Sequence, residues 1–503
     1  MKTKNMKHIF IFSVLTTILF SCSKDYLEVT PKGTSLEETY YQNEDEAYSA
    51  LISVYDIMSL NSSSWDNMIS FMNAGSDDNY GASAPGDAIS LFSYNQLTPS
   101  NMPRGFWSNH YQGIFRANTL LQKLPNVPMD ESLKLRFEGE CKAMRAYYHF
   151  NLVRMFGAIP LMTKTISPVE AQTFPQSSKE DVYAQIEKDL LEAIELLPTS
   201  INPATEGGRW SKGAAKAMLG KVYVYDNKLT EAAAQLAEVN GTPGGTSQFG
   251  YRLLDNFKDL WVHKNKFNTE SILEDVHTEA GRADWGGLGF GTEGNILNIM
   301  VGIRDYTRTE GSTAPDYFSG WGVNTVTQNL HDVLSGDPRF EATIIDVKAL
   351  IASGQVKGYS FVNEASTNTG YFMAKFVPLK SDATTIGGDP TLNFYQDTYI
   401  IRLADTYLLE AEALGGTGAR AQALLDAVRA RVGLPSTPVS LDAIALERRK
   451  ELACEGHRWF DLVRTGKAAT VLGSRGFVAG KNEVLPIPEK ELENSVIVQN
   501  PMY

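Results

Sequence analysis

Cysteine is scarce in this chain, with three residues among 503, and histidine is little more frequent, with seven. A small scaffold held together by disulfides is excluded, because such domains are short and dense in cysteine. The chain also lacks the C-x-x-C and H-E-x-x-H spacings that bring zinc ligands together. We therefore expect no metal site and no cofactor. Cys141 and Cys454 fall within helical patterns and are either two buried thiols or one disulfide.

Positive charge is also in short supply. Lysine and arginine number 46 against 59 aspartates and glutamates, which gives a net charge of −13. Nucleic acid is not an expected partner, because its binding depends on a basic surface that neutralises phosphates. A neutral ligand is compatible with this charge. The length and the 43% of hydrophobic residues are sufficient for one large core or two smaller ones.

No apolar run is long enough to cross a bilayer as a helix, which takes about 20 residues. The apolar segment Ile9–Phe20 follows three lysines and leads into Leu-Phe-Ser-Cys at positions 19–22, the pattern of a bacterial lipobox. We predict a lipoprotein signal peptide at residues 1–21 and lipidation of Cys22, which would tether the protein to a membrane. The less favoured alternative is a cleavable signal followed by an incidental cysteine.

Helical periodicity dominates the first half of the chain. Apolar residues recur at helical spacing in 44–59, 106–124, 133–156 and 181–197. A polar stretch rich in glycine, serine and asparagine separates the first two helices. Beyond them, tetratricopeptide repeat positions, whose period is about 34 residues, are filled by Leu219, Gly220, Tyr223, Ala232 and Leu236.

A second repeat match runs from Tyr407 to Pro435, although Glu410 occupies a position that is usually apolar. A third unit would pair 141–156 with 181–197; alternatively, these are helical hairpins of no repeat family. The predicted fold is mainly α: a tetratricopeptide-like, right-handed solenoid of helical hairpins, with long loops and a few short strands packed over it.

The middle of the chain, residues 241–389, has a different composition. It is rich in glycine, threonine, asparagine and aromatic residues, with strand-like runs at Ser271–Val276 and Tyr371–Val377. Seven tryptophans and 22 tyrosines in the chain argue against disorder. We expect long loops and short strands here, and long irregular segments of this kind often carry binding function.

Three patterns suggest enzymatic or nucleotide chemistry and are set aside. Residues 289–294 satisfy G-x-G-x-x-G, but no strand-loop-helix context surrounds them. His457 and Asp461 stand four residues apart without a second histidine to complete a metal helix. Asp77 and Asp78 are adjacent and suit a turn, or hydrogen bonding to a ligand, better than an acid/base pair across a cleft. We predict a protein that is not an enzyme, although a hidden carboxylate pair stays open among 59 acids.

Two C-terminal segments resemble a known family. Residues 399–413 read YIIRLADTYLLEAEA and residues 447–466 read ERRKELACEGHRWFDLVRTG. Both are similar to motifs of the SusD/RagB family, as are 145–150 (RAYYHF) and the LPIP and QNPMY segments of the tail. The resemblance divides the chain into an N-terminal helical region (22–240) and a C-terminal region (241–503) with a loop-rich insert (241–389) and a last repeat plus signature helix (399–466). We expect the charges of 447–464 to form an ion-pair network that locks this segment onto the solenoid.

The resemblance implies a lipid-anchored protein of a Gram-negative outer membrane, facing the cell exterior. It would capture an oligosaccharide or polysaccharide without catalysis and deliver it to a SusC-like TonB-dependent transporter. The alternatives are peptide capture of the RagB type and a repeat-based interaction scaffold.

Sugar binding needs flat aromatic faces for the CH side of the ring and polar groups for its hydroxyls. Two loop regions, around residues 65–80 and 282–321, offer this mixture. The predicted ligand contacts are Trp65, Asp78, Asn79, Tyr80, Trp285, Tyr306 and Trp321.

Overall fold

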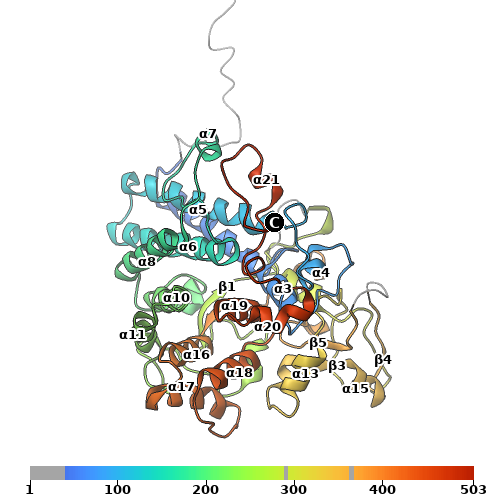
Figure 1. Ribbon diagram of the computed structural model, residues 1–503. Helices are drawn as coiled ribbons and strands as arrows, with labels where there is room; N and C mark the ends of the chain where they lie inside the picture. The colour runs from blue at the N-terminus through green and yellow to red at the C-terminus, as the bar shows by residue number, and fades with distance from the viewer. Residues whose placement is uncertain (1–39, 288–292, 362–366) are drawn as a thin grey trace, which may run out of the picture.

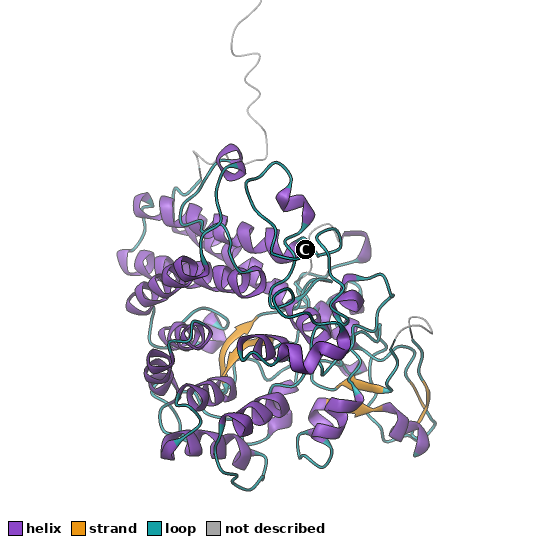
Figure 2. Ribbon diagram, in the orientation of Figure 1, coloured by secondary structure: helices purple, strands orange, loops and turns teal. Residues whose placement is uncertain are grey.

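The computed structural model describes residues 40–287, 293–361 and 367–503 (Figures 1 and 2). The predicted signal peptide, Cys22 and residues 289–292 of the glycine motif lie outside these residues. The longer helices of the described part are α2 (Glu44–Tyr55), α5 (Gly105–Lys123), α6 (Glu131–Phe156), α8 (Lys179–Leu196), α10 (Lys212–Tyr225), α11 (Leu229–Asn240), α16 (Leu403–Ala413), α17 (Gly418–Arg431) and α18 (Leu441–Glu451).

Shorter α-helices of four to seven residues are α3 (Met68–Ala74), α4 (Ala88–Phe92), α7 (Pro168–Gln172), α9 (Pro203–Glu206), α12 (Ile296–Val301), α13 (Gln328–Leu334), α14 (Phe340–Thr343), α15 (Val347–Ala352), α19 (Arg458–Arg464), α20 (Ala468–Leu472) and α21 (Glu489–Leu492). The strands are β1 (Ser271–Asp275), β2 (Thr307–Arg308), β3 (Ile344–Asp346), β4 (Val356–Gly358), β5 (Tyr371–Met373) and β6 (Thr398–Arg402). The 3-10 helices are η4 (Asp56–Asn61), η5 (Leu124–Asn126), η6 (Phe257–Trp261), η7 (Trp285–Gly287), η8 (Lys380–Asp382), η9 (Pro390–Leu392) and η10 (Gly473–Arg475).

The long helices stack into one continuous array. Helix α6 packs on α8, α8 on α10, α10 on α11, α11 on α16, and α16 on both α17 and α18. In Figure 1 these pairs follow one another down the left side of the molecule. The predicted helical-hairpin solenoid is confirmed, and the third unit, α6 with α8, is part of it. No helix among the described residues combines the length and apolarity needed to cross a membrane.

Small residues allow the repeat helices to approach closely, as the motif predicts. A Cβ atom on Gly220 would lie 2.5 Å from the side chain of Leu236, which is fully buried between α10 and α11. Ala232 is buried in the same small cluster. Glu410, at a position usually apolar, is also buried, and it accepts hydrogen bonds from Asn240 (2.8 Å) and Arg420 (3.0 Å). The neighbouring guanidinium therefore offsets the cost of burying this carboxylate.

The insert is built differently from the solenoid. Its first strand, β1, pairs antiparallel with β6, which leads directly into α16. The expected strands at 271–276 and 371–377 are present but shorter than predicted. Four short helices, α12 to α15, were not predicted, because elements of four to seven residues do not complete a recognisable apolar period. The expected helix at 44–59 likewise ends at Tyr55 and continues as η4.

Two large hydrophobic clusters occupy the described chain. The larger lies between the solenoid helices and the second lies within the insert, where α12, α13, β3 and β5 contribute residues. Cys454 belongs to the second cluster and Cys141 to the first. Both are buried free thiols, which resolves the two alternatives left by the sequence.

A network of buried ions joins the insert, the solenoid and the signature segment. Glu451 of α18 accepts from Arg402 of β6 (2.7 Å), from Arg339 of the insert (2.9 Å) and from Arg431 of α17. Arg402 also donates to Glu455 (2.8 Å). The predicted ion-pair network is therefore present, and it fixes the loop-bearing insert to the helical array.

Candidate functional site

Three tryptophans from distant parts of the chain lie together on the surface. The rings of Trp65 and Trp321 stack with centroids 4.8 Å apart, those of Trp65 and Trp285 lie 5.8 Å apart, and those of Trp285 and Trp321 lie 6.2 Å apart. Trp65 is 44% exposed and Trp285 is 47% exposed, whereas Trp321 is partly buried. We call this group the tryptophan surface. The structure brings together the three tryptophans that the sequence predicts as ligand contacts, and their role in binding stays a prediction.

The connection that carries Trp65, between η4 and α3, is fixed by buried hydrogen bonds. The hydroxyl of Ser62 donates to Asp275 (2.9 Å) and lies 2.7 Å from Nε2 of His277. Oγ of Ser63 lies 3.1 Å from Nδ1 of the same ring. Burial lowers the pKa of His277, but the carboxylate of Asp275 outweighs burial and the net shift of the pKa is upward.

Trp321 is positioned through the backbone of α12. Its N–H donates to the carbonyl of Ile299 (2.9 Å), and the N–H of Gly322 donates to the carbonyl of Gly302 (2.8 Å). A Cβ atom on Gly320 would lie only 2.3 Å from the Ile299 oxygen, so only glycine allows this approach. The ring of Trp321 packs against the core of the insert.

Trp285 stands in the 3-10 turn η7, and the residues before it are tied to a second loop. The N–H of Ala283 donates to Oδ1 of Asn393 (2.9 Å), and Nδ2 of Asn393 donates back to the Ala283 carbonyl (2.9 Å). The N–H of Asp389 reaches the same carbonyl. The three tryptophans are thus held by anchored segments rather than by free loops, which reduces the entropy lost when a ligand binds.

Polar side chains without internal partners lie close to the tryptophans along the chain or beside a neighbouring residue. Asp66 follows Trp65, Asp284 precedes Trp285, and Arg282 lies two residues further back; all three are exposed. Arg304 lies beside Gly322, the residue after Trp321. In the described structure these four side chains form no hydrogen bond or ion pair. They are available to exchange hydrogen bonds with a ligand that lies on the aromatic faces.

Asp78, Asn79 and Tyr306 are placed elsewhere, and their prediction as ligand contacts needs correction. Asp78 is 1% exposed and accepts from Arg449 (2.6 Å), while Asn79 is fully buried and donates to the carbonyl of Asn324 (3.0 Å). The ring of Tyr306 is buried, and its hydroxyl donates to the Pro315 carbonyl (3.1 Å). Each residue makes an interior hydrogen bond, as buried polar groups generally do, while Oδ2 of Asp78 and Oδ1 of Asn79 have no partner in the described structure.

Among the described residues Tyr80 makes no ring contact with the tryptophans; its ring is near that of Tyr94, with centroids 6.4 Å apart. Tyr94 is not among the ligand contacts that the sequence predicts. The sequence also does not predict that Ser62, Ser63 and His277 hold the segment that carries Trp65. No signal in the sequence could have linked the serines to His277, because more than 200 residues separate them.

The carboxylates that suggested catalysis are neutralised by arginines. Asp77 accepts from Arg458 (2.8 Å), and Arg449 bridges Asp77 and Asp78. Burial raises the pKa of Asp77, but the hydrogen bond and charge of Arg458 outweigh it and hold the pKa below its usual value. This arrangement is a structural ion cluster, in which neither carboxylate faces an open cleft as a free acid or base.

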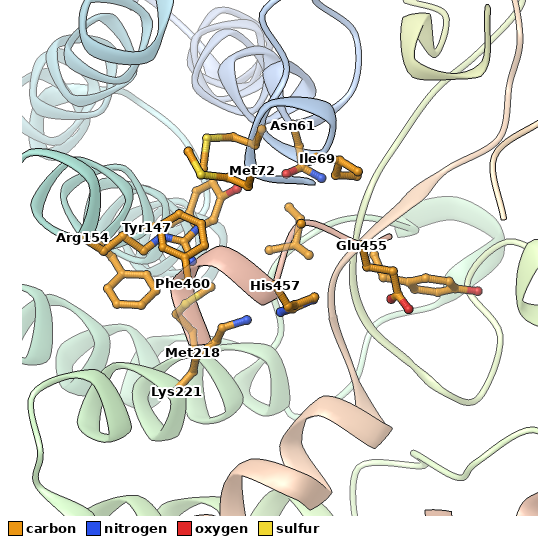
Figure 3. A pocket seen from close by; sticks show the side chains of 15 residues that line it. Asn61, Ile69, Met72, Tyr147, Arg154, Met218, Lys221, Glu455, His457 and Phe460 are labelled. Carbon is orange, nitrogen blue, oxygen red and sulfur yellow. The ribbon is translucent and has the colours of Figure 1, made fainter. Parts of the chain in front are cut away.

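The small pocket at the junction of the solenoid and the signature segment is shown in Figure 3. It is lined by His457, Glu455, Lys221, Arg154 and Tyr147, among others, and its volume is about 40 Å³. One water molecule takes up about 30 Å³ in the liquid, and a sugar ring is several times larger than a water molecule. The pocket is therefore too small for a sugar ring. Burial and the charge of Lys221 lower the pKa of His457 to about 4.

His457 and Asp461 do not form an acid–base pair. Asp461 accepts from Arg448 and Arg464 instead, and burial of the carboxylate is outweighed by these two charges, which hold its pKa well below the usual range. Within the described ranges, no group of three or more histidine, cysteine, aspartate or glutamate side chains could hold a metal ion. Gly294, at the described end of the glycine motif, packs against Leu392 two residues before the short helix α12 begins.

Fold and surface together define a helical-repeat protein that presents an anchored aromatic surface on a loop-rich insert. The model of the SusD family matches residues 302–503, and a second family model, described as starch-binding associating with outer membrane, matches residues 25–224. A solved structure described as a laminarin binding SusD-like protein is 57% identical, with a TM-score of 0.89, and the match covers 92% of this chain and all of that one. The chain belongs to the SusD family.

Two more distant relatives are consistent with this assignment. A SusD-like protein of Bacteroides ovatus is 26% identical over 482 residues, which cover 91% of this chain and 82% of that protein. The surface glycan-binding protein A from Bacteroides thetaiotaomicron, solved in complex with laminarihexaose, is 23% identical with a TM-score of 0.78. That match covers 91% of this chain and 99% of the other and supports the fold.

Proposed function

We propose that this chain is a cell-surface glycan-binding protein and that the tryptophan surface is its principal binding site. The observation that carries the proposal is the convergence of Trp65, Trp285 and Trp321, two of them almost half exposed. Monomeric proteins seldom expose clustered large aromatic side chains unless the cluster is functional.

The chemistry of the surface suits a neutral saccharide. A pyranose ring has a face of CH groups, which loses unfavourable contact with water when it stacks on an indole. Its hydroxyls need partners that both donate and accept. Asp66 and Asp284 are able to accept hydrogen bonds, and Arg282 and Arg304 are able to donate them.

The glycan that we propose is a laminarin-type glucan. Support comes from the laminarin-binding SusD-like protein, which is 57% identical to this chain over 92% of its length. We further propose that the protein is anchored in the outer membrane through a lipid on Cys22, after removal of residues 1–21. It would then pass its ligand to a SusC-like TonB-dependent transporter without cleaving it.

The binding proposal is tested by isothermal titration calorimetry with laminarin. Each of Trp65→Ala, Trp285→Ala and Trp321→Ala should weaken binding about tenfold or more, because each removes a large apolar contact of about 1.5–3 kcal/mol. Phe115→Ala is a matched control, since Phe115 is 51% exposed on α5, outside the tryptophan surface. Unchanged laminarin affinity in a folded triple variant would overturn the proposal, and preferential binding of peptides would favour the RagB-type alternative.

Anchoring and the absence of catalysis are tested separately. Cys22→Ala should move the protein from the membrane fraction to the soluble fraction of its native host. A SusC-like transporter should co-purify with the wild-type protein. Chromatography of laminarin oligosaccharides after prolonged incubation should show no shorter products, and their appearance would contradict a purely binding role.

A further inference from the structure

A hollow lies beside α4. Its volume is about 230 Å³, and its lining includes Tyr80, Gly81, Ser90, Tyr94 and Gln96. Tyr94 is 42% exposed at the mouth of the hollow, and Tyr80 is half-buried. We propose that this hollow is a second glycan subsite, separate from the tryptophan surface, which binds a further part of a long glycan chain. This inference rests on the proposed function.

The ring of Tyr80 is held in a fixed position. The Arg475 guanidinium lies over it, 4.2 Å from its centroid, and donates to the carbonyl of Asn79 (2.8 Å). The N–H of Tyr80 donates to the carbonyl of Thr325 (2.9 Å). Because the backbone and one contact of the ring are fixed in advance, a ligand that meets this ring loses little entropy from ordering it.

The loop that forms one wall of the hollow is packed tightly against α4. The N–H of Gly81 donates to Oγ of Ser93 (2.7 Å), and the N–H of Ser83 donates to Oγ of Ser90 (3.2 Å). A Cβ atom on Gly81 would lie 2.6 Å from the carbonyl oxygen of Ile89. The hollow is therefore a defined feature of the packed fold and not a gap between loose loops.

The lining favours a neutral, hydroxyl-rich ligand. It contains two tyrosines, serines, a glutamine and a threonine, and none of the described residues that line it carries a charge. In the described part of the chain, the Gln96 amide and the Tyr80 hydroxyl have no hydrogen-bond partner, and the Tyr94 hydroxyl has one weak contact with Thr367 (3.3 Å). An uncharged mixture of aromatic faces and unused hydrogen-bonding groups is what a sugar ring requires.

The size and the position of the hollow fit one or a few sugar units of a longer chain. It is several times larger than the roughly 30 Å³ of a water molecule. Thr325, the backbone partner of Tyr80, is four residues from Trp321, which limits their Cα separation to about 14 Å. Adding the spacing of about 5 Å between paired strands places Tyr80 within about 20 Å of Trp321. A polysaccharide is therefore long enough to reach both.

The test compares a long and a short ligand. Laminarin polysaccharide and laminaritriose are titrated into the wild-type protein and into Tyr94→Ala, Gln96→Ala, Trp285→Ala and the control Phe115→Ala. Tyr94→Ala should weaken polysaccharide binding about fivefold and leave the trisaccharide affinity within twofold, because the short ligand binds at the tryptophan surface. Trp285→Ala should weaken both. Circular dichroism and the melting temperature verify that each variant is folded.

The outcomes separate this inference from the proposed function. If Trp285→Ala loses binding while Tyr94→Ala and Gln96→Ala bind both ligands like the wild type, the second subsite is wrong and the main site stands. If Tyr94→Ala weakens both ligands equally, the hollow is not a separate subsite. If the wild-type protein binds neither ligand, the proposed function fails and the second subsite fails with it.

Discussion

His149 is a buried residue of α6 whose charge state affects stability. One ring nitrogen contacts the carbonyl of Arg145 at 3.1 Å, and the other, Nε2, has no hydrogen-bond partner in the described structure. Burial and the nearby charge of Arg145 lower the pKa of His149 to about 3. In the unfolded chain its pKa is about 6.5, so the unfolded state binds a proton first as the pH falls.

Acidification should therefore favour unfolding, and His149 should contribute to this effect. Between pH 7 and pH 5 this histidine should lower the free energy of unfolding by about 2 kcal/mol, because it becomes protonated in the unfolded chain and stays neutral in the folded one. His149→Phe should make this loss smaller by about that amount. Urea unfolding at the two pH values measures it, and identical pH dependence in the two proteins would contradict the assignment.

At the scale of elements, the repeat helices depend on the absence of a side chain at one position. Gly220 of α10 faces Leu236 of α11, and an added Cβ would lie 2.5 Å from two of its carbons. Close packing of this kind tolerates extra volume poorly, because neighbouring side chains leave their preferred rotamers.

Gly220→Val should destabilise the protein by about 1–3 kcal/mol through this overpacking. Gly473→Val is a suitable control, because a Cβ there meets nothing within 4 Å and its φ is not positive. Thermal and urea unfolding of both variants measure the difference. Equal stability of the two variants would show that α10 and α11 adjust without cost.

At the scale of the whole molecule, the buried ions around Glu451 decide how the insert is held. Its carboxylate pairs with Arg339 of the insert, Arg402 of β6 and Arg431 of α17. Burial raises the pKa of Glu451, but the three guanidiniums outweigh it and hold the pKa well below its usual range. All four side chains are buried or nearly so.

Glu451→Gln should destabilise the protein by about 3–5 kcal/mol, because it removes the one carboxylate that the three buried guanidiniums share. The control is Glu238→Gln, because the Glu238 carboxylate that pairs with Lys216 is about half exposed and its loss should cost at most about 1 kcal/mol. Chemical denaturation with tryptophan fluorescence follows both variants. A loss of equal size at the two sites would contradict a special role for the buried network.

The sequence by itself determined the helical array and the family. Helical period and the spacing of small residues are local properties, so the sequence around Gly220 predicts α10 and α11. The family motif in residues 447–466 is likewise contained within one short segment. The same locality explains the failures. Asp78 and Asn79 are polar residues in a polar stretch, and nothing within that stretch shows that Arg449 and Asn324 bury and pair them.

Only the tertiary structure decided which aromatic residues share a surface. Trp65 and Trp285 are 220 positions apart, and the stacking of their rings depends on how β1, α12 and the loop around Asn393 are packed. Tyr306, with a similar local sequence environment, became part of the core instead. Exposure is set by contacts between distant segments, and the sequence does not record those contacts locally.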